Sequence, residues 1–114
     1  MENDQKVVIF ITTGTDEEAN RLAEVLLKQR KAACVNIVPG VRSHFWWEGN
    51  LDSDQESLLI VKAKASLLDE IIALVKEVHT YDVPEVIALP IIGGNPDYLE
   101  WIGKELQERD DSKC

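Results

Sequence analysis

The stretch that decides the fold runs from Cys34 to Lys64 and reads CVNIVPGVRSHFWWEGNLDSDQESLLIVKAK. Two runs of alternating polar and apolar residues flank a turn-rich segment, Glu48–Asp54. Alternation of this kind is typical of strands whose two faces are solvated differently, so the stretch predicts a β-hairpin. Both arms are longer than the roughly 5–6 residues of a common strand. A small domain cannot cover such arms along their whole length, and we expect their ends to contact a partner.

The segment before the hairpin predicts a strand followed by a helix. The β-branched run Lys6–Thr13 is continuous, which is typical of a central strand buried on both faces. Thr15 and Glu18 have the spacing of a capping box, in which Thr15 caps the helix and Glu18 reaches back to it. Apolar residues then recur at helical spacing up to a basic last turn, so we expect this helix to end near Arg30.

The segment after the hairpin predicts the same unit again, followed by one more helix. Ser66 is the expected N-cap of a second helix, and residues 83–92 predict a strand that two prolines confine to a sheet edge. Asn95-Pro96 is typical of the start of a third helix. The order β-α-β-β-α-β is the ferredoxin-like plan of the α+β class, here with an extended central hairpin and an extra C-terminal helix. Right-handed crossovers place the first two helices on one face, with the first hairpin arm and the last strand at the sheet edges.

Length and charge limit what the chain can be. Its 114 residues predict one domain over 1–114, with 1–5 and 108–114 flexible. The net charge of −9 argues against nucleic acid and anionic membranes as partners, because both are bound by clustered lysine and arginine. The apolar run Val7–Ile11 is too short for a membrane span or a signal-peptide core, and the two cysteines form no closely spaced pair. These features predict a cytoplasmic location.

Residues 79–85, HTYDVPE, gather an imidazole, a phenol and two carboxylates in the turn before a strand. His79 and Glu85 are nitrogen and oxygen ligands of the kind that copper or zinc accepts. The alternative is structural: His79 caps the end of a helix, and Glu85 pairs with a lysine or arginine. An enzyme built on this segment is a third and weaker hypothesis.

The aromatic residues of the hairpin favour packing between subunits. Trp46 and Trp47 are large apolar groups with a polar atom, a type enriched at protein interfaces. Several other chemistries lack their motifs: there is no CxxC for a metal chaperone, no aromatic RNA-binding run and no glycine-rich phosphate loop.

Four segments together carry a family resemblance: AACVNIVPGVRSHFWWEGNL, ESLLIVKAK, HTYDVPEVIALPI and NPDYLEWI. In order and spacing they resemble the CutA divalent-cation-tolerance family, over about Val7 to Leu106. The resemblance implies a ferredoxin-like subunit assembled as a homotrimer, similar in architecture to the PII signalling proteins, with long hairpin arms that pair between subunits. It also implies a role in tolerance of copper and other divalent cations and no enzymatic reaction.

The resemblance extends to single positions and fails at others. The matched positions are Cys34, Trp47, Lys62, His79, Tyr81, Pro84 and Glu85. A first-strand cysteine that some members associate with copper is absent from Phe10–Thr13, and Val78 stands where some members have a histidine.

We therefore expect a homotrimer that binds copper or zinc weakly through His79 and Glu85. A PII-like trimer that binds a small molecule or a protein at its subunit clefts is the alternative. The expected cleft residues are Cys34, Lys62 and Tyr81. The expected interface residues are Phe45, Trp46 and Trp47.

Overall fold

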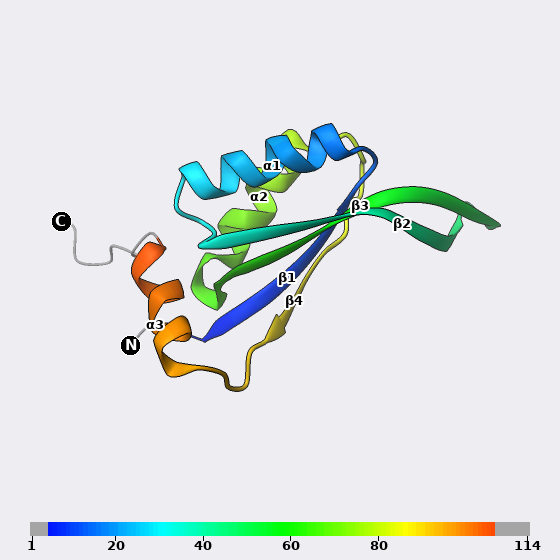
Figure 1. Ribbon diagram of the computed structural model, residues 1–114. Helices are drawn as coiled ribbons and strands as arrows, with labels where there is room; N and C mark the ends of the chain where they lie inside the picture. Colours follow the sequence, from blue (N-terminus) through cyan, green and yellow to red (C-terminus); the bar gives the residue numbers. More distant parts are fainter. Residues whose placement is uncertain (1–4, 107–114) are drawn as a thin grey trace.

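One antiparallel sheet carries the fold, with its four strands in the order β2-β3-β1-β4 (Figure 1). The computed structural model describes residues 5–106, so the predictions for 1–4 and 108–114 lie outside the described residues. The elements are β1 (Lys6–Thr13), α1 (Asp16–Lys28), β2 (Cys34–Trp47), β3 (Asn50–Lys64), the 3-10 turn η1 (Ala65–Leu67), α2 (Leu68–Val78), β4 (Val86–Pro90) and α3 (Pro96–Glu105). This order and topology confirm the predicted ferredoxin-like α+β fold with its extra C-terminal helix.

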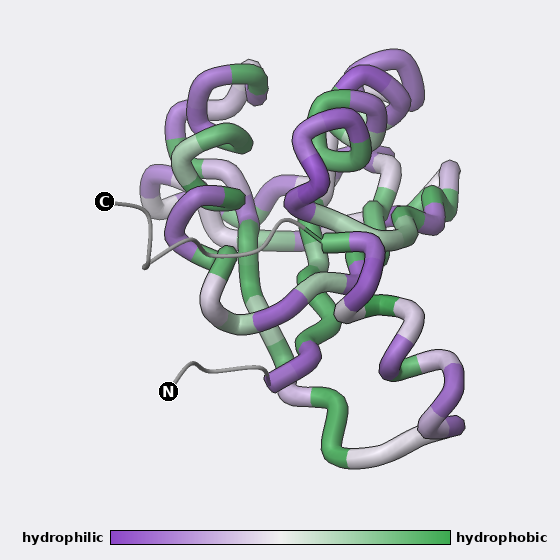
Figure 2. Tube along the Cα trace, turned by 90° about the vertical axis from the view of Figure 1, so that its left-hand side faces the viewer, coloured by the Kyte–Doolittle hydropathy of each residue, from purple (hydrophilic) through white to green (hydrophobic). Residues whose placement is uncertain are grey.

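The core lies between the sheet and the helices α1 and α2, which cover one face of the sheet (Figure 1). Alternate residues of β1 and β3, among them Ile9 and Val61, have no solvent exposure there, and neither do Leu22 and Ile71 of the helices. Figure 2 colours the chain by hydropathy: strands contain hydrophobic stretches, and helices alternate between hydrophilic and hydrophobic segments. Burial of this apolar surface is the main term that stabilises the fold.

Within the described residues 5–106, the opposite face of the sheet carries no helix comparable to α1 or α2, and we call it the open face. Burial in β1 alternates from Lys6 to Ile11 and is continuous only at the end of the strand, so the prediction of a strand buried on both faces is wrong for most of its length in the single chain. The β-branched run is continuous because its alternate side chains lie on the open face. Apolar residues on this face remain half-buried or exposed. Cross-strand pairing places Val8, Phe10, Val38, Leu58, Ile60, Ile87 and Leu89 on this face.

Two of the three predicted N-cap residues cap their helices. Thr15 accepts a hydrogen bond from the Glu18 amide at 3.1 Å, and the Asn95 side chain accepts one from the Asp97 amide at 2.9 Å. The Ser66 cap is wrong, because the chain leaves β3 through the turn η1, which already contains Ser66, and α2 begins without a side-chain cap. The Glu18 carboxylate does not reach back to Thr15 but binds Thr80.

The hairpin is longer than the sequence predicts. Its turn is only Glu48-Gly49, both with positive φ (51° and 81°), so β3 already begins at Asn50. The register shifts between Val38 and Val41, at the Pro39-Gly40 interruption, as expected of a β-bulge. Beyond this point the hairpin projects past the ends of the helices and of β1 (Figure 1).

Candidate functional site

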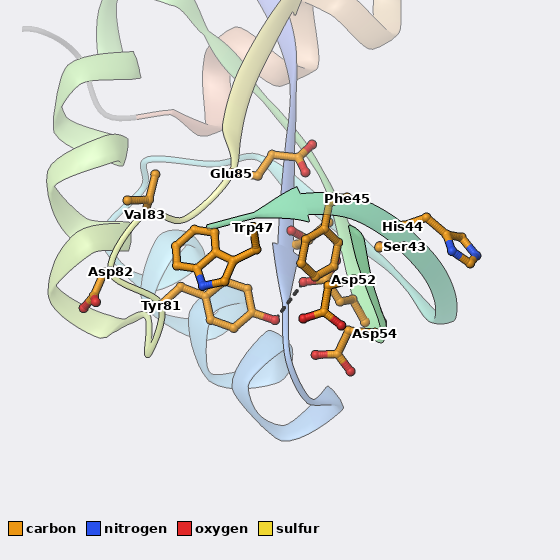
Figure 3. A pocket seen from close by; sticks show the side chains of 12 residues that line it. Ser43, His44, Phe45, Trp47, Asp52, Asp54, Tyr81, Asp82, Val83 and Glu85 are labelled. Carbon is orange, nitrogen blue, oxygen red and sulfur yellow. Dashed lines mark hydrogen bonds between the residues drawn. The ribbon is translucent and has the colours of Figure 1, made fainter. Parts of the chain in front are cut away.

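A pocket of about 620 Å³ lies where the projecting hairpin leaves the sheet (Figure 3). One wall is the face of the hairpin that carries Phe45 and Trp47, and the other is the loop between α2 and β4. The end of β1 closes the pocket at Thr12. The site is therefore assembled from segments that are far apart in the sequence.

The hairpin wall combines aromatic rings with carboxylates. Phe45 pairs with Asp52, and Ser43 pairs with Asp54, across the two antiparallel strands. Directly paired residues share one face of a sheet, so the acidic side chains of β3 lie beside the aromatic side chains of β2. Figure 3 shows His44 turned away from these rings, as strand alternation requires.

Tyr81 joins the loop wall to the hairpin wall. Its hydroxyl donates a hydrogen bond to Glu56 Oε2 at 2.7 Å (Figure 3). Gly14 makes room for this ring, because a Cβ at that position would lie 3.3 Å from the Tyr81 hydroxyl oxygen. Burial raises the pKa of the Tyr81 phenol above its ordinary value, and the hydrogen bond to the Glu56 carboxylate raises it further. The phenol is therefore a neutral donor at physiological pH.

His79 holds the same loop from the interior side. Its side chain is fully buried, and its Nδ1 accepts a hydrogen bond from the Tyr81 amide at 3.0 Å. Nε2 then carries the proton and donates to the Thr12 carbonyl at 2.7 Å. The neighbouring Thr80 amide donates to Glu18 Oε2 at 2.8 Å, which ties the loop to α1. Both ring nitrogens are engaged, so the geometry favours the structural alternative for His79.

The predicted metal pair does not form a compact centre. Glu85 is exposed and lines the pocket, whereas His79 is buried and is not among the pocket residues. Within residues 5–106, no three His, Cys, Asp or Glu side chains lie close enough together to hold one metal ion. A tight zinc centre needs three or four protein ligands. The described residues of the single chain therefore do not fit a strong zinc or copper centre.

The three predicted cleft residues fall in two places. Tyr81 lines the pocket, but Cys34 and Lys62 are paired with each other across β2 and β3, nearer to α3. The Lys62 ammonium donates to the Asn36 side chain. Burial, together with the neighbouring Cys34, raises the pKa of the Tyr98 phenol. Cys34 and Lys62 thus belong to a second polar cluster on the open face.

The predicted interface aromatics lie on both faces of the hairpin. Trp46 is 72% exposed and points to the face opposite that of Phe45 and Trp47. Trp47 is 51% exposed in the single chain, and Phe45 is half-buried. Exposed aromatic groups of this size are typical of surfaces that bind a partner.

Sequence reasoning missed the acidic half of the pocket. Asp52 and Asp54 fall in the segment predicted as a turn, and the sequence analysis predicts no role for Glu56. The signal was present in the alternation: with a tight two-residue turn, all three carboxylates fall on the face that carries Phe45.

The chain matches one family along nearly its whole length. The model of the CutA1 divalent ion tolerance protein family matches residues 7–105. The rice protein named Protein CutA 1, chloroplastic, is 51% identical over 102 residues, covering 90% of this chain and 58% of the relative. The Thermus thermophilus divalent-cation tolerance protein CutA is 45% identical over 95 residues, covering 83% of this chain and 92% of the relative.

Solved structures agree with these matches. The crystal structure of CutA1 from Oryza sativa superposes with a TM-score of 0.90 at 48% identity, covering 94% of this chain and 98% of that one. The chain spans only 58% and 53% of the length of the two plant relatives from rice and Arabidopsis thaliana.

The prediction of a cytoplasmic location is wrong as an inference from composition. The rice and Arabidopsis relatives are named chloroplastic, and the Archaeoglobus fulgidus structure is described as a periplasmic protein. The same fold and similar residues therefore occur in proteins named for different compartments. Within residues 5–106, no helix is long and apolar enough to cross a membrane.

Proposed function

Because the chain belongs to the CutA1 divalent ion tolerance protein family, we propose that it acts in divalent-cation tolerance as a homotrimer that binds such cations weakly. The proposal includes no catalysed reaction. It has two parts, an assembly and a cation site, and each rests on a different feature of the subunit.

The projecting hairpin supports the assembly. Strands of 14 and 15 residues extend beyond the helices that cover the rest of the sheet. On the open face, Val38, Ile87 and Leu89 are 41%, 51% and 45% exposed, although they belong to the sheet. Such contiguous apolar surface is costly in water and is typical of an interface. A second and third copy would cover it, with Phe45, Trp46 and Trp47 of the hairpin at the contacts.

The carboxylates of the pocket support weak cation binding. Glu85 lines the pocket with Asp52 and Asp54, and each carboxylate attracts a divalent cation. Any further ligand has to come from water or from a neighbouring subunit, because one subunit supplies no group of three ligands within its described residues. His79 is not part of this proposed site, because both of its ring nitrogens are already hydrogen-bonded.

Light scattering and copper titration test the two parts separately. Size-exclusion chromatography with light scattering is expected to give three subunits at micromolar concentration, and a folded monomer would contradict the assembly. Calorimetric copper titration is expected to weaken in Glu85→Gln and to stay unchanged in Glu24→Gln, a matched exposed acid on α1. Equal copper affinity in the two variants would contradict the cation site.

The pocket itself supports a second candidate, a PII-like trimer that binds a small molecule. Its volume of about 620 Å³ is far larger than one ion needs and lies within the range of small-molecule sites. Aromatic walls with a few polar groups are the usual composition of such sites. Ligand-dependent changes in the thermal midpoint of the trimer would test this candidate.

A further inference from the structure

Glu56 is a buried carboxylate with one unused oxygen. The residue is only 9% exposed, and its Oε2 accepts the Tyr81 hydroxyl at 2.7 Å. Within residues 5–106, Oε1 receives no hydrogen bond, and no fully buried side-chain oxygen or nitrogen lacks a partner. Oε1 is therefore accessible to solvent, and it is exposed in the pocket that Glu56 lines. A carboxylate oxygen that has no protein donor and opens into the pocket is free to accept from a cationic donor there.

Two more carboxylates continue from Glu56 along the same strand. Asp54 and Asp52 follow at alternate positions of β3, so all three lie on one face at steps of about 7 Å. Each aspartate uses one oxygen to accept the amide of the next residue, which leaves the other oxygen available. Among the residues that the structure describes, no lysine or arginine lines the pocket. The negative charge of this row is not neutralised within the pocket.

The spacing of this row suits an extended cation better than a point charge. A calcium ion needs several oxygens at about 2.3–2.6 Å from one centre, and steps of about 7 Å along a strand do not provide them. Beside the row, Phe45 and Trp47 offer apolar faces, which attract methylene groups and organic ammonium ions. Figure 3 shows these two rings next to Asp52 and Tyr81, on the same side of the hairpin.

We propose that the pocket binds an elongated aliphatic polyamine. One ammonium group donates to Glu56 Oε1, the next ammonium group lies at Asp54 or Asp52, and the methylene chain between them packs on Phe45 and Trp47. This inference rests on the second candidate function, in which the pocket takes a small molecule, and it names the chemical class of that molecule.

Calorimetric titration of the full chain with 1,4-diaminobutane tests the proposal. The diamine is expected to bind more tightly than n-butylamine at equal ionic strength, because only the diamine reaches two carboxylates of the row. Glu56→Gln keeps an acceptor for the Tyr81 hydroxyl and removes the charge, so affinity for the diamine is expected to fall about tenfold or more. Glu24→Gln on α1 removes an equal charge outside the pocket and is expected to change affinity by less than about twofold.

A second variant and two metal titrations complete the test. Asp54→Asn changes an exposed residue and is expected to fold normally, so it reports on the row if Glu56→Gln does not fold. Equal affinity for the monoamine and the diamine, or equal affinity in Glu56→Gln and Glu24→Gln, would overturn the proposal. Magnesium and copper titrations on the same trimer separate the two hypotheses: cation binding without diamine binding contradicts only the polyamine site, and the reverse result contradicts only the metal site.

Discussion

At the scale of single residues, the hydrogen bond from Tyr81 to Glu56 connects the two walls of the pocket. The bond is strong because its acceptor is charged, and a phenol that donates to a carboxylate resists deprotonation. The backbone of Tyr81 is held separately, by the hydrogen bond from its amide to His79 Nδ1.

The first prediction concerns Tyr81→Phe at alkaline pH. Below the ordinary tyrosine pKa of 10.0 the phenol is protonated in both folded and unfolded chains, so the stability it contributes is fully present. Above pH 10.0 the unfolded chain loses this proton first, so the free energy of unfolding falls as pH rises toward the higher pKa of the folded state. Tyr81→Phe lacks this term and is expected to lose less stability between about pH 9 and pH 11. Urea unfolding of both proteins at fixed protein concentration measures the two slopes, and parallel slopes would refute the assignment.

The second prediction concerns His79→Ala. The substitution leaves the Thr12 carbonyl and the Tyr81 amide without their buried partner, which is expected to cost about 2–4 kcal/mol of unfolding free energy. Copper affinity at about pH 7.5 is expected to stay unchanged, because both ring nitrogens are already engaged. His44→Ala, on the exposed face of the hairpin, serves as control for loss of an imidazole and is expected to change stability little. A large loss of copper affinity with intact stability would instead make His79 a ligand.

At the scale of elements, the hairpin turn controls how far the two arms extend. Glu48 and Gly49 both adopt positive φ, the conformation of a type I′ turn, whose twist matches that of the strands it joins. The turn therefore holds the register that places Asp52 and Asp54 beside Phe45 and Ser43.

The third prediction compares two glycines. Gly49→Ala places a Cβ at φ +81°, which is expected to cost about 1–2 kcal/mol although no atom lies within 4 Å of it. Gly93→Ala meets open space without a positive φ and is expected to be nearly neutral. Thermal unfolding of both variants checks the difference. If Gly49→Ala proves as stable as Gly93→Ala, the left-handed turn does not limit stability.

The elements were easier to predict from sequence than the site. Periodicity predicted the four strands and the three α-helices, because this signal is local, and the capping signals held at Thr15 and Asn95 but not at Ser66. The pocket was only half predicted, since Tyr81 belongs to a conspicuous segment while Glu56 gains its role from a ring 25 residues away in the chain. The role of His79 likewise depends on the Thr12 carbonyl, 67 residues away, and no local pattern contains that contact.

At the scale of the whole molecule, the subunit has one covered and one uncovered sheet face. The helices α1 and α2 bury the first, and the apolar residues of the open face remain half-buried or exposed in the single chain. The net charge of −9 opposes close approach of copies, so in the proposed trimer the apolar area would have to supply the association energy. Carboxylates near the hairpin would add to this repulsion unless cations lie between them.

The last prediction therefore concerns assembly. Ile87 lies on the open face of β4 and is 51% exposed, whereas Ile92 lies beyond the end of that strand and is 97% exposed. Ile87→Glu would bury an unpaired charge in the proposed interface, at a cost of several kcal/mol per subunit, and is expected to shift the protein from trimer to monomer at micromolar concentration. Ile92→Glu makes the same chemical change at a more exposed position and is expected to leave the trimer intact. Light scattering on both variants, with circular dichroism to show that each subunit is folded, checks this. A trimeric Ile87→Glu would exclude the open face as the interface and leave the hairpin arms as the surface through which copies associate.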